Sequence, residues 1–177
     1  YEYVDLGLSV KWATCNVGAS SPSDCGDYFA WGETKTKSEY TDANSKNHRK
    51  NIRRKTRSIA GEKSYDAARA KWGGTWRMPN VDEFRSLIEE CTWTWASMNS
   101  HEGYLVTGPN GNSIFLPITG IRSDGNEILW SDEGQYWSGL IKDKYGWETD
   151  ILIFDRDSYK IRWTYRAFGI PIRPVTE

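Results

Sequence analysis

The sequence has few of the residues that build metal centres and acid–base sites: of its 177 residues, two are histidine and three are cysteine. His48 lies in a strongly basic stretch and His101 precedes a predicted hairpin, so neither has the neighbours that a zinc site or a Ser-His-Asp site needs. Asp155 and Asp157 stand two residues apart, but a turn accounts for both, because aspartate closes turns with its carboxylate. We therefore expect no enzyme activity, no metal and no cofactor.

Long apolar runs are also missing, and no stretch could span a bilayer. The net charge of −1 provides no overall attraction to nucleic acid or to an acidic membrane surface. Three cysteines allow at most one intrachain disulfide, so the chain must fold by burying a core. Its length suits one domain, residues 1–177. The chain starts at Tyr1 without methionine, which suggests a mature or truncated form, so a missing signal sequence says little about location.

Aromatic residues, by contrast, are abundant: there are ten tryptophans and ten tyrosines. Core formation alone does not favour tryptophan, which is large and carries an N–H that needs an acceptor. Two interpretations therefore stay open. The indoles either fill a β-rich core, or some of them line a groove or platform that binds a partner.

Residues 35–62 lose almost all hydrophobic character, and residues 46–57 contain seven lysines and arginines with no acidic residue. Such a cluster is found in sites for nucleic acid and other polyanions. It is also typical of a solvent-exposed insertion loop between two structured parts. Because no aromatic residues stand between the basic ones, the sequence favours the loop, and we expect no nucleic-acid partner.

Two helices are predicted in the middle of the chain. The first covers 65–71, with Ser64 as its cap and Gly73-Gly74 at its end. The second begins after Asn80, and Glu83 at the third helical position completes a capping box. Its apolar face contains Val81, Phe84, Leu87, Ile88 and Cys91, at helical spacing.

The rest of the chain has the alternation and turn residues of β-structure. Early strands are expected at 10–13 and 28–31, and the closing 169–175, with its two prolines, suits an edge strand. Three hairpins are expected, connected by the turns at 108–112, 123–126 and 155–158. We therefore predict an α+β fold in which two helices pack on a mainly antiparallel β-sheet.

Six segments carry a resemblance to a known family. They are Tyr3-Val4-Asp5-Leu6-Gly7-Leu8, Trp12-Ala13-Thr14-Cys15-Asn16-Val17-Gly18-Ala19, Gly26-Asp27-Tyr28-Phe29-Ala30-Trp31-Gly32-Glu33-Thr34, Trp72-Gly73-Gly74-Thr75-Trp76-Arg77-Met78-Pro79, Gly108-Pro109-Asn110-Gly111-Asn112-Ser113-Ile114-Phe115-Leu116-Pro117 and Ile172-Arg173-Pro174-Val175. Together they resemble the Fibrobacter succinogenes major paralogous domain, which is common in surface and secreted proteins of gut Bacteroidetes. The resemblance covers nearly the whole chain except 35–62.

This resemblance implies a C-type-lectin-like fold of the formylglycine-generating-enzyme type, in which the N- and C-terminal strands pair. It also implies a secreted or cell-surface protein. Cys15 and Cys91 both fall in or near segments typical of the family, which makes them the preferred disulfide pair. The pair Cys15 and Cys25 remains the alternative, because sequence cannot decide connectivity.

Relatives in this group include the variable proteins of diversity-generating retroelements. In them a hypermutated segment lies between a Tyr-Trp-Ser-Ser-like start and a Val-Arg-Pro-Val-like end. Here the corresponding ends are Tyr136-Trp137-Ser138-Gly139 and Ile172-Arg173-Pro174-Val175, both slightly off that pattern. By analogy, residues 140–168 become the candidate ligand-display segment.

Two activities known from related folds lack their residues here. Calcium-dependent sugar binding uses Glu-Pro-Asn or Gln-Pro-Asp together with Trp-Asn-Asp, and Gly108-Pro109-Asn110 lacks the first ligand. Formylglycine-generating chemistry needs a reactive cysteine pair late in the fold, whereas all three cysteines come early. Stacking of a sugar on tryptophan or tyrosine remains open.

The function predicted from these observations is non-catalytic binding of a protein or glycan ligand through residues 140–168. An alternative is a structural or assembly module of a surface appendage or envelope complex. The strand 159–165 has two sides, and sequence leaves open which one faces solvent. Trp137, Trp147, Ile172 and Val175 are assigned to the core. The ligand-binding residues expected are Lys142, Asp143, Tyr145, Asp155, Asp157, Tyr159, Trp163, Tyr165 and Arg166.

Overall fold

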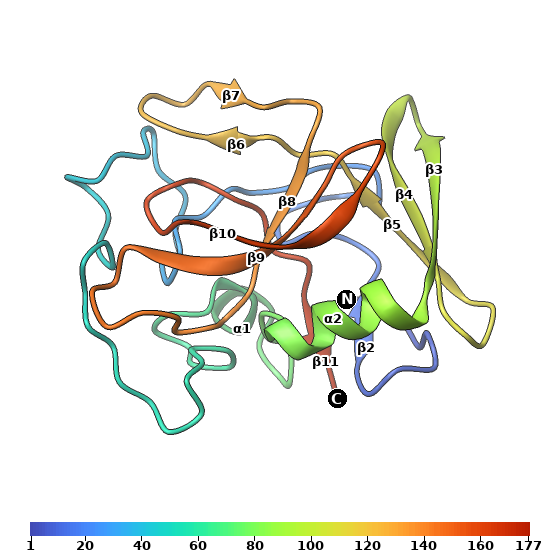
Figure 1. Cartoon of the computed structure of the whole chain (residues 1–177), viewed down its shortest axis with the longest axis horizontal. Helices are drawn as coiled ribbons and strands as arrows, with labels where there is room; N and C mark the ends of the chain where they lie inside the picture. The colour runs from blue at the N-terminus through green and yellow to red at the C-terminus, as the bar shows by residue number, and fades with distance from the viewer.

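A computed structural model describes all residues, 1–177, and shows two helices and eleven strands. The helices are α1 (Ala67–Trp72) and α2 (Val81–Glu90). The strands are β1 (Tyr3–Val4), β2 (Lys11–Ala13), β3 (Thr92–Met98), β4 (His101–Thr107), β5 (Ser113–Pro117), β6 (Ile121–Arg122), β7 (Ile128–Leu129), β8 (Gly134–Trp137), β9 (Glu148–Phe154), β10 (Tyr159–Tyr165) and β11 (Val175–Thr176). Figure 1 shows their arrangement.

The predicted α+β class with antiparallel pairing is confirmed, but the strands form four small sheets in place of one large sheet. Their orders are β1-β2-β11, β3-β4-β5, β6-β7 and β10-β9-β8. The three predicted hairpins are β4–β5, β6–β7 and β9–β10. No strand exceeds seven residues, because turn residues interrupt the chain repeatedly. Neither helix has the length or apolar character needed to cross a membrane.

The expected pairing of the chain's two ends is confirmed, since β2 lies between β1 and β11. Trp12 is the central residue of this sheet and pairs with Val4 on one side and Val175 on the other. The strand expected at 169–175 is much shorter than predicted. Pro171 and Pro174 lack the N–H that a β-ladder needs, so this buried stretch makes only scattered backbone bonds before β11 begins. The strand expected at 28–31 is likewise reduced to a single bridge at Phe29.

Helix α1 starts two residues later than predicted, because Asp66, and not Ser64, is its N-cap. The buried Asp66 carboxylate accepts hydrogen bonds from the backbone N–H groups of Ala68 and Arg69 in the helix. It also accepts from the N–H groups of Gly61 and Met78, at 2.7 and 2.9 Å. One carboxylate therefore caps the helix and ties it to two loops, which a serine hydroxyl could not do.

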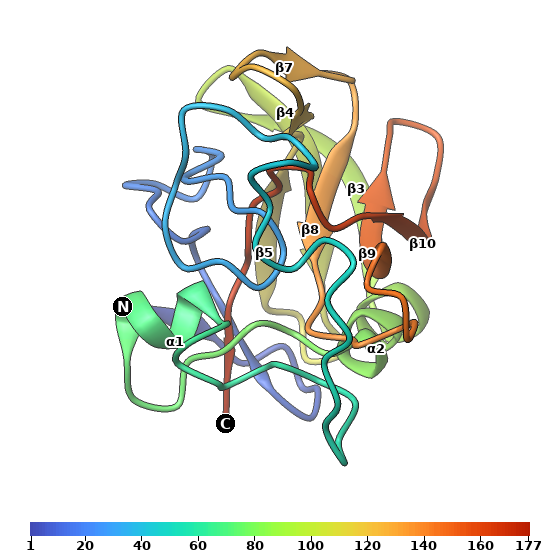
Figure 2. The same ribbon diagram turned by 90° about the vertical axis from the view of Figure 1, so that its left-hand side faces the viewer.

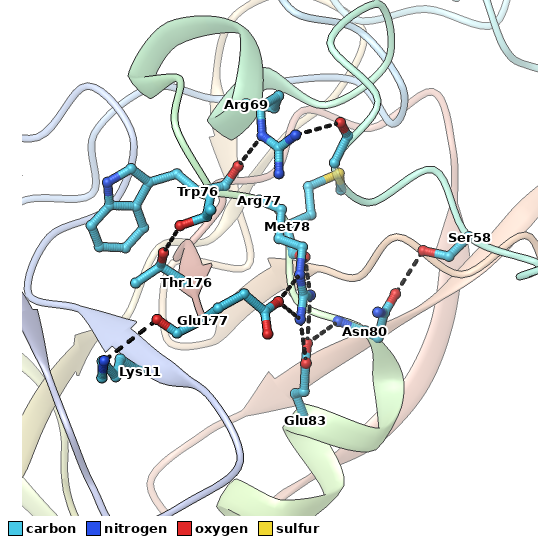
Figure 3. A network of polar contacts seen from close by, with 12 residues as sticks. Lys11, Ser58, Arg69, Trp76, Arg77, Met78, Asn80, Glu83, Thr176 and Glu177 are labelled. Atoms are coloured by element: carbon cyan, nitrogen blue, oxygen red, sulfur yellow. Dashed lines mark hydrogen bonds and ion pairs between the residues drawn. The ribbon is translucent and has the colours of Figure 1, made fainter.

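Helix α2 has the predicted capping box, in which the Asn80 N–H donates to Glu83 Oε1 at 2.8 Å. Glu83 also binds Arg77 through both carboxylate oxygens, at 2.6 and 2.8 Å. Figure 3 shows that Arg77 also faces Glu177, so this network joins the helix to the end of the chain. The predicted apolar face of α2 packs inward and contacts β9 and β10.

Two clusters of buried side chains form most of the core. The first surrounds Trp31 and Trp137, and the second surrounds Trp12, Phe84 and Phe154. The assignments of Trp137, Ile172 and Val175 to the core are confirmed. Several tryptophans are therefore core residues. Trp31 and Trp137 donate their buried N–H groups to the carbonyls of Ser138 and Phe29, at 2.9 and 2.6 Å, whereas the buried Trp12 N–H has no partner.

The loop at 35–62 contains neither helix nor strand and wraps one side of the molecule (Figures 1 and 2). All seven of its basic residues between 46 and 57 are exposed, as expected. It is nevertheless anchored to the domain, because Tyr40, Asn47, Ile52 and Ile59 are buried. Ile52 and Ile59 belong to the first core cluster, so this segment is part of the fold.

The expected disulfide between Cys15 and Cys91 is not formed, and neither is the alternative with Cys25, because all three cysteines are free thiols. They lie in different environments. Cys91 ends α2 and packs against the second core cluster, whereas Cys25 packs against Tyr28 and Tyr40 and donates to the Ile118 carbonyl at 3.2 Å. The position of a cysteine in a family motif says nothing about the distance to another thiol, and the preferred pairing was wrong for that reason.

Cys91 is expected to react slowly with alkylating reagents. Burial, with the neighbouring Glu90 adding to it, raises the pKa of its thiol to about 11. The thiolate is the reactive form, so a thiol with this pKa has about a hundredfold less thiolate at pH 8 than an ordinary one near 9. Iodoacetamide labelling followed by peptide mass spectrometry measures the rate. Urea-unfolded protein is the control, and equal rates in the two states would contradict the expectation.

Candidate functional site

The feature that stands out on the surface is a row of aromatic rings in edge-to-face contact, which we call the aromatic stripe: Trp130, Phe168, Tyr165 and Trp163. Successive ring centroids lie 5.9, 5.6 and 5.3 Å apart along this row. Trp130, Tyr165 and Trp163 are 51, 42 and 45% exposed. Single exposed apolar residues are normal, but contiguous rings on a surface mark interaction sites.

Well-ordered backbone holds the stripe in place. Trp163 and Tyr165 stand on β10, which pairs along its whole length with β9. Trp130 directly follows β7, and the β6–β7 hairpin is fixed to the chain after Phe168 by two reciprocal backbone bonds between Arg122 and Gly169, at 2.9 and 2.8 Å. The rings are thus pre-positioned, which lowers the entropy lost on binding.

A pocket of about 260 Å³ lies beside the stripe, with Trp130, Trp163, Tyr165 and Phe168 among its lining residues. Gln135 on β8 also lines it and is almost fully buried. Its amide nitrogen donates to Glu133 at 3.1 Å, and since a carboxylate only accepts, this contact fixes the orientation of the amide. The Gln135 Oε1 atom then has no partner in the protein. The pocket lining therefore includes the Glu133 carboxylate and the Arg162 donor, and the unpaired Gln135 acceptor is buried next to it.

Two further hollows adjoin Tyr165. One, of about 620 Å³, is lined by Asp143, Tyr145, Trp147, Glu148 and Tyr165. The other, of about 610 Å³, extends from Trp147 and Tyr165 to His48 and the 40–43 loop. Tyr165 therefore stands where three hollows meet, and Tyr145, 63% exposed, extends the aromatic surface beyond the stripe.

Of the nine predicted ligand-binding residues, Tyr145, Trp163 and Tyr165 meet at this surface. The open question about β10 has a mixed answer, because α2 and β3 cover only one end of it. Tyr159 at that end is half-buried and stacks on Trp93, with centroids 4.4 Å apart. Trp163 and Tyr165, at the other end of the same side, face solvent.

Three of the predicted polar side chains, those of Lys142, Asp143 and Asp155, have structural contacts of their own. Asp143 borders the larger hollow, but its carboxylate accepts from the Gly146, Trp147 and Glu148 N–H groups and closes that turn. Lys142 pairs with Asp150 at 2.9 Å and with Glu148 at 3.4 Å.

Asp155 and Asp157 lie in the β9–β10 turn, at the opposite end of the hairpin from Trp163. Asp155 accepts from the N–H groups of Asp157 and Ser158, and these bonds lower the pKa of its carboxyl group. Turn closure therefore accounts for Asp155, and Asp157 is separate from the aromatic stripe.

Two assignments were wrong. Arg166 is fully buried, so its side chain cannot meet a partner at the surface. The guanidinium lies 4.2 Å from the centre of the Trp31 ring and donates to the carbonyls of Asn47, Lys50 and Glu148. Burial lowers its pKa to about 10. Trp147, assigned to the core, is 41% exposed and lies between His48 and Arg49.

Sequence reasoning missed Trp130, Phe168 and Gln135. The apolar run Ile128-Leu129-Trp130 on a short hairpin between polar turns was a signal for Trp130, because such a hairpin has little core to fill. No sequence signal pointed to Gln135, whose free acceptor depends on the position of Glu133.

No group of three or more His, Cys, Asp or Glu side chains lies close enough together to hold a metal ion. Comparison with protein-family models, curated proteins and solved structures finds no match to this chain. The class that the structure defines is therefore a small, mostly antiparallel α+β domain with an exposed aromatic site.

Proposed function

We propose that this chain is a non-catalytic ligand-binding domain that is displayed outside the cell and binds its partner at the aromatic stripe and the adjoining hollows. The observation that carries the proposal is the stripe itself, with four connected rings, of which two stand on β10 and two lie next to paired backbone. Tryptophan and tyrosine supply large contact areas at low conformational cost, and they dominate the binding energy of many interfaces. Arg162 at the pocket wall adds a directional polar contact.

The pocket beside the stripe favours a particular kind of group. A flat or apolar group fits between the rings, and an N–H or O–H on that group would donate to the unpaired Gln135 Oε1. Because this acceptor is already buried and unpaired in the free protein, a ligand that supplies the donor gains a hydrogen bond worth about 1 kcal/mol, and a ligand without one meets no new cost. Both a protein side chain and a sugar ring have the required character.

We also propose a specific fold, that of a C-type-lectin-like domain similar to the Fibrobacter succinogenes major paralogous domain. The six sequence segments quoted above support it, as do the pairing of both chain ends through β2 and the two helices. In this proposal residues 140–168 are the segment that a retroelement diversifies, and they supply Tyr145, Trp147, Trp163 and Tyr165.

Sequencing the same locus from many isolates tests this version. We expect substitutions to concentrate at exposed positions of the segment, namely 145, 147, 163 and 165. Positions such as Ile151, Leu152 and Arg166 lie in the same segment but are buried, so they serve as internal controls and should stay constant. Divergence spread evenly along the chain would contradict a diversified surface.

The alternative is an assembly module whose aromatic stripe packs against a sister domain. Light scattering after size-exclusion chromatography separates the two functions. A binding domain elutes as a monomer of 20.3 kDa, whereas an assembly module elutes as a larger species that Trp163→Ala converts to the monomer.

A further inference from the structure

The basic segment 46–57 and residues 140–147 lie next to each other (Figure 2), and we call the surface that they form the basic face. Backbone hydrogen bonds join the two segments: the Arg49 N–H donates to the Gly146 carbonyl at 2.7 Å, and the Ile141 N–H donates to the Arg57 carbonyl at 2.8 Å. Gly146 has a φ of 75°, and a Cβ there would lie 2.4 Å from the Lys50 backbone. The close approach of the two segments therefore requires glycine.

Most cations on this face have no acidic partner. Arg54 pairs with Glu62 and Lys142 with two carboxylates, but no carboxylate lies within ion-pairing distance of the other seven: Lys46, Arg49, Lys50, Arg53, Lys55, Arg57 and Lys144. The whole chain carries −1 and residues 46–57 carry +7, so the remaining 165 residues carry −8. This separation of charge steers an anionic partner toward the basic face.

The face also has a hollow of about 320 Å³, whose walls come from both segments. Arg53, Arg54 and Arg57 line one side, and Lys142 and Lys144 line the other. Its two apolar lining residues, Ile52 and Ile141, are buried. Asp143 also lines the hollow, but its carboxylate accepts from three N–H groups of its own turn. The hollow therefore offers five cationic side chains and their hydrogen-bond donors against one carboxylate.

Aromatic rings stand among these cations, although the sequence between 46 and 57 contains none. Arg49 lies 4.3 Å from the Trp147 ring centre, Lys144 lies 5.1 Å from that of Tyr145, and Lys50 lies 5.2 Å from that of Tyr65. The absence of interleaved aromatics was the reason for treating 46–57 as a solvated loop. In the folded protein the reason no longer holds, because residue 65 and residues 145–147 bring aromatic rings next to the basic residues.

We infer that the basic face is a second binding surface, and that its ligand is an anionic polysaccharide carrying sulfate or carboxylate groups. Guanidinium groups bind such planar or tetrahedral oxyanions through two parallel hydrogen bonds. A polymer with an anion on most sugar units can meet cations on both walls of the hollow at once.

The rings argue against single-stranded nucleic acid, which binds by stacking bases on open aromatic faces. Here Trp147 contacts Arg49 and His48, whose ring centroid lies 5.6 Å away, and Tyr65 contacts Lys50 and Arg54. Tyr145 alone is mostly exposed, and one ring cannot stack a run of successive bases. The lining argues against an acidic peptide, because the hollow has no apolar pocket for a side-chain anchor. The positive charge and hydrogen-bond donors of the basic face therefore match a charged glycan better than a nucleic acid or an acidic peptide.

Calorimetric titration of the full chain with heparin tests the inference. We expect binding that weakens roughly 50- to 150-fold between 50 and 200 mM salt, the drop for about four neutralised anions. Cations on and away from this face allow a matched pair of variants: Arg53→Gln/Lys55→Gln/Lys144→Gln against Lys11→Gln/Arg85→Gln/Lys160→Gln. Each removes three positive charges, but only the first should lower heparin affinity, by at least tenfold.

Equal losses in the two triple variants, or no heparin binding, would overturn the inference. Neutral dextran, poly-L-glutamate and a 20-nucleotide oligothymidylate serve as competing probes, and tighter binding of any one of them would also overturn it. Tyr145 and Trp147 are shared by the two surfaces, but Trp163 does not line the hollow between the cations, so Trp163→Ala should leave heparin binding unchanged. Failure of this surface is therefore distinguishable from failure of the proposed function.

Discussion

Replacing Arg173 with methionine is expected to lower the free energy of unfolding by about 3–5 kcal/mol. The side chain is completely buried, and it donates to Asn16 Oδ1, the Ala13 carbonyl and the Phe115 carbonyl at 2.7, 3.3 and 2.9 Å. Methionine removes a costly buried charge, which offsets part of the loss. It also leaves three buried acceptors without donors, at about 1–3 kcal/mol each, so the loss prevails.

Urea denaturation followed by tryptophan fluorescence measures this change. Arg85→Met on the exposed side of α2 is the matched control and should shift stability by less than about 0.5 kcal/mol. Arg173→Lys should fall between the two, since an ammonium group cannot reach three separate acceptors with the geometry of a guanidinium. A loss below 1 kcal/mol in Arg173→Met would mean that water replaces the missing donors.

Arg166→Met is expected to destabilise the domain by about 2–4 kcal/mol and to release the basic loop. The loss is smaller than for Arg173 because one Arg166 nitrogen, Nη2, has no partner already. The contacts of Arg166 identify the segment that would be released, because its Nη1 atom donates to the carbonyls of Asn47 and Lys50. Without these bonds, residues 46–50 lose their attachment to the end of β10.

Limited trypsin digestion with mass spectrometry reports this local effect. Cleavage after Lys50 and Arg53 should accelerate at least tenfold in Arg166→Met, and heparin affinity should fall with it. Arg162→Met, which changes an exposed arginine on β10 four residues before Arg166, is the control and should digest like the original protein. Faster cleavage spread over the whole chain would indicate global destabilisation and contradict a local role for Arg166.

Much of the fold could be predicted because its signals are local. The capping box of α2 lies within four residues, and the β4–β5 hairpin is specified by the turn between 108 and 112. Helix α1 starts two residues later than predicted, because Asp66 accepts hydrogen bonds from the N–H groups of two loops as well as of the helix. That preference could not be read from the helix sequence alone.

The candidate site was harder to predict, because exposure depends on what covers each strand. Alternation along β10 correctly placed Trp163 and Tyr165 on one side, but the same side is covered near Tyr159. Alternation ends with the strand at Tyr165, and Arg166 then turns into the core. Trp147 was misassigned because its neighbours, His48 and Arg49, lie about a hundred residues away in the chain.

The sheet that joins the two ends of the chain also determines how the domain would bear mechanical load. Tyr3 pairs opposite Ala13, and Thr176 pairs opposite Lys11, so β1 begins and β11 ends at opposite ends of β2. Tension applied through these outer strands therefore runs along the strand direction. It must shear the hydrogen bonds on both sides of Trp12 together, whereas peeling would break them one at a time. A surface-displayed domain pulled through both ends would thus resist at this sheet, while the aromatic stripe and the basic face remain outside the line of force.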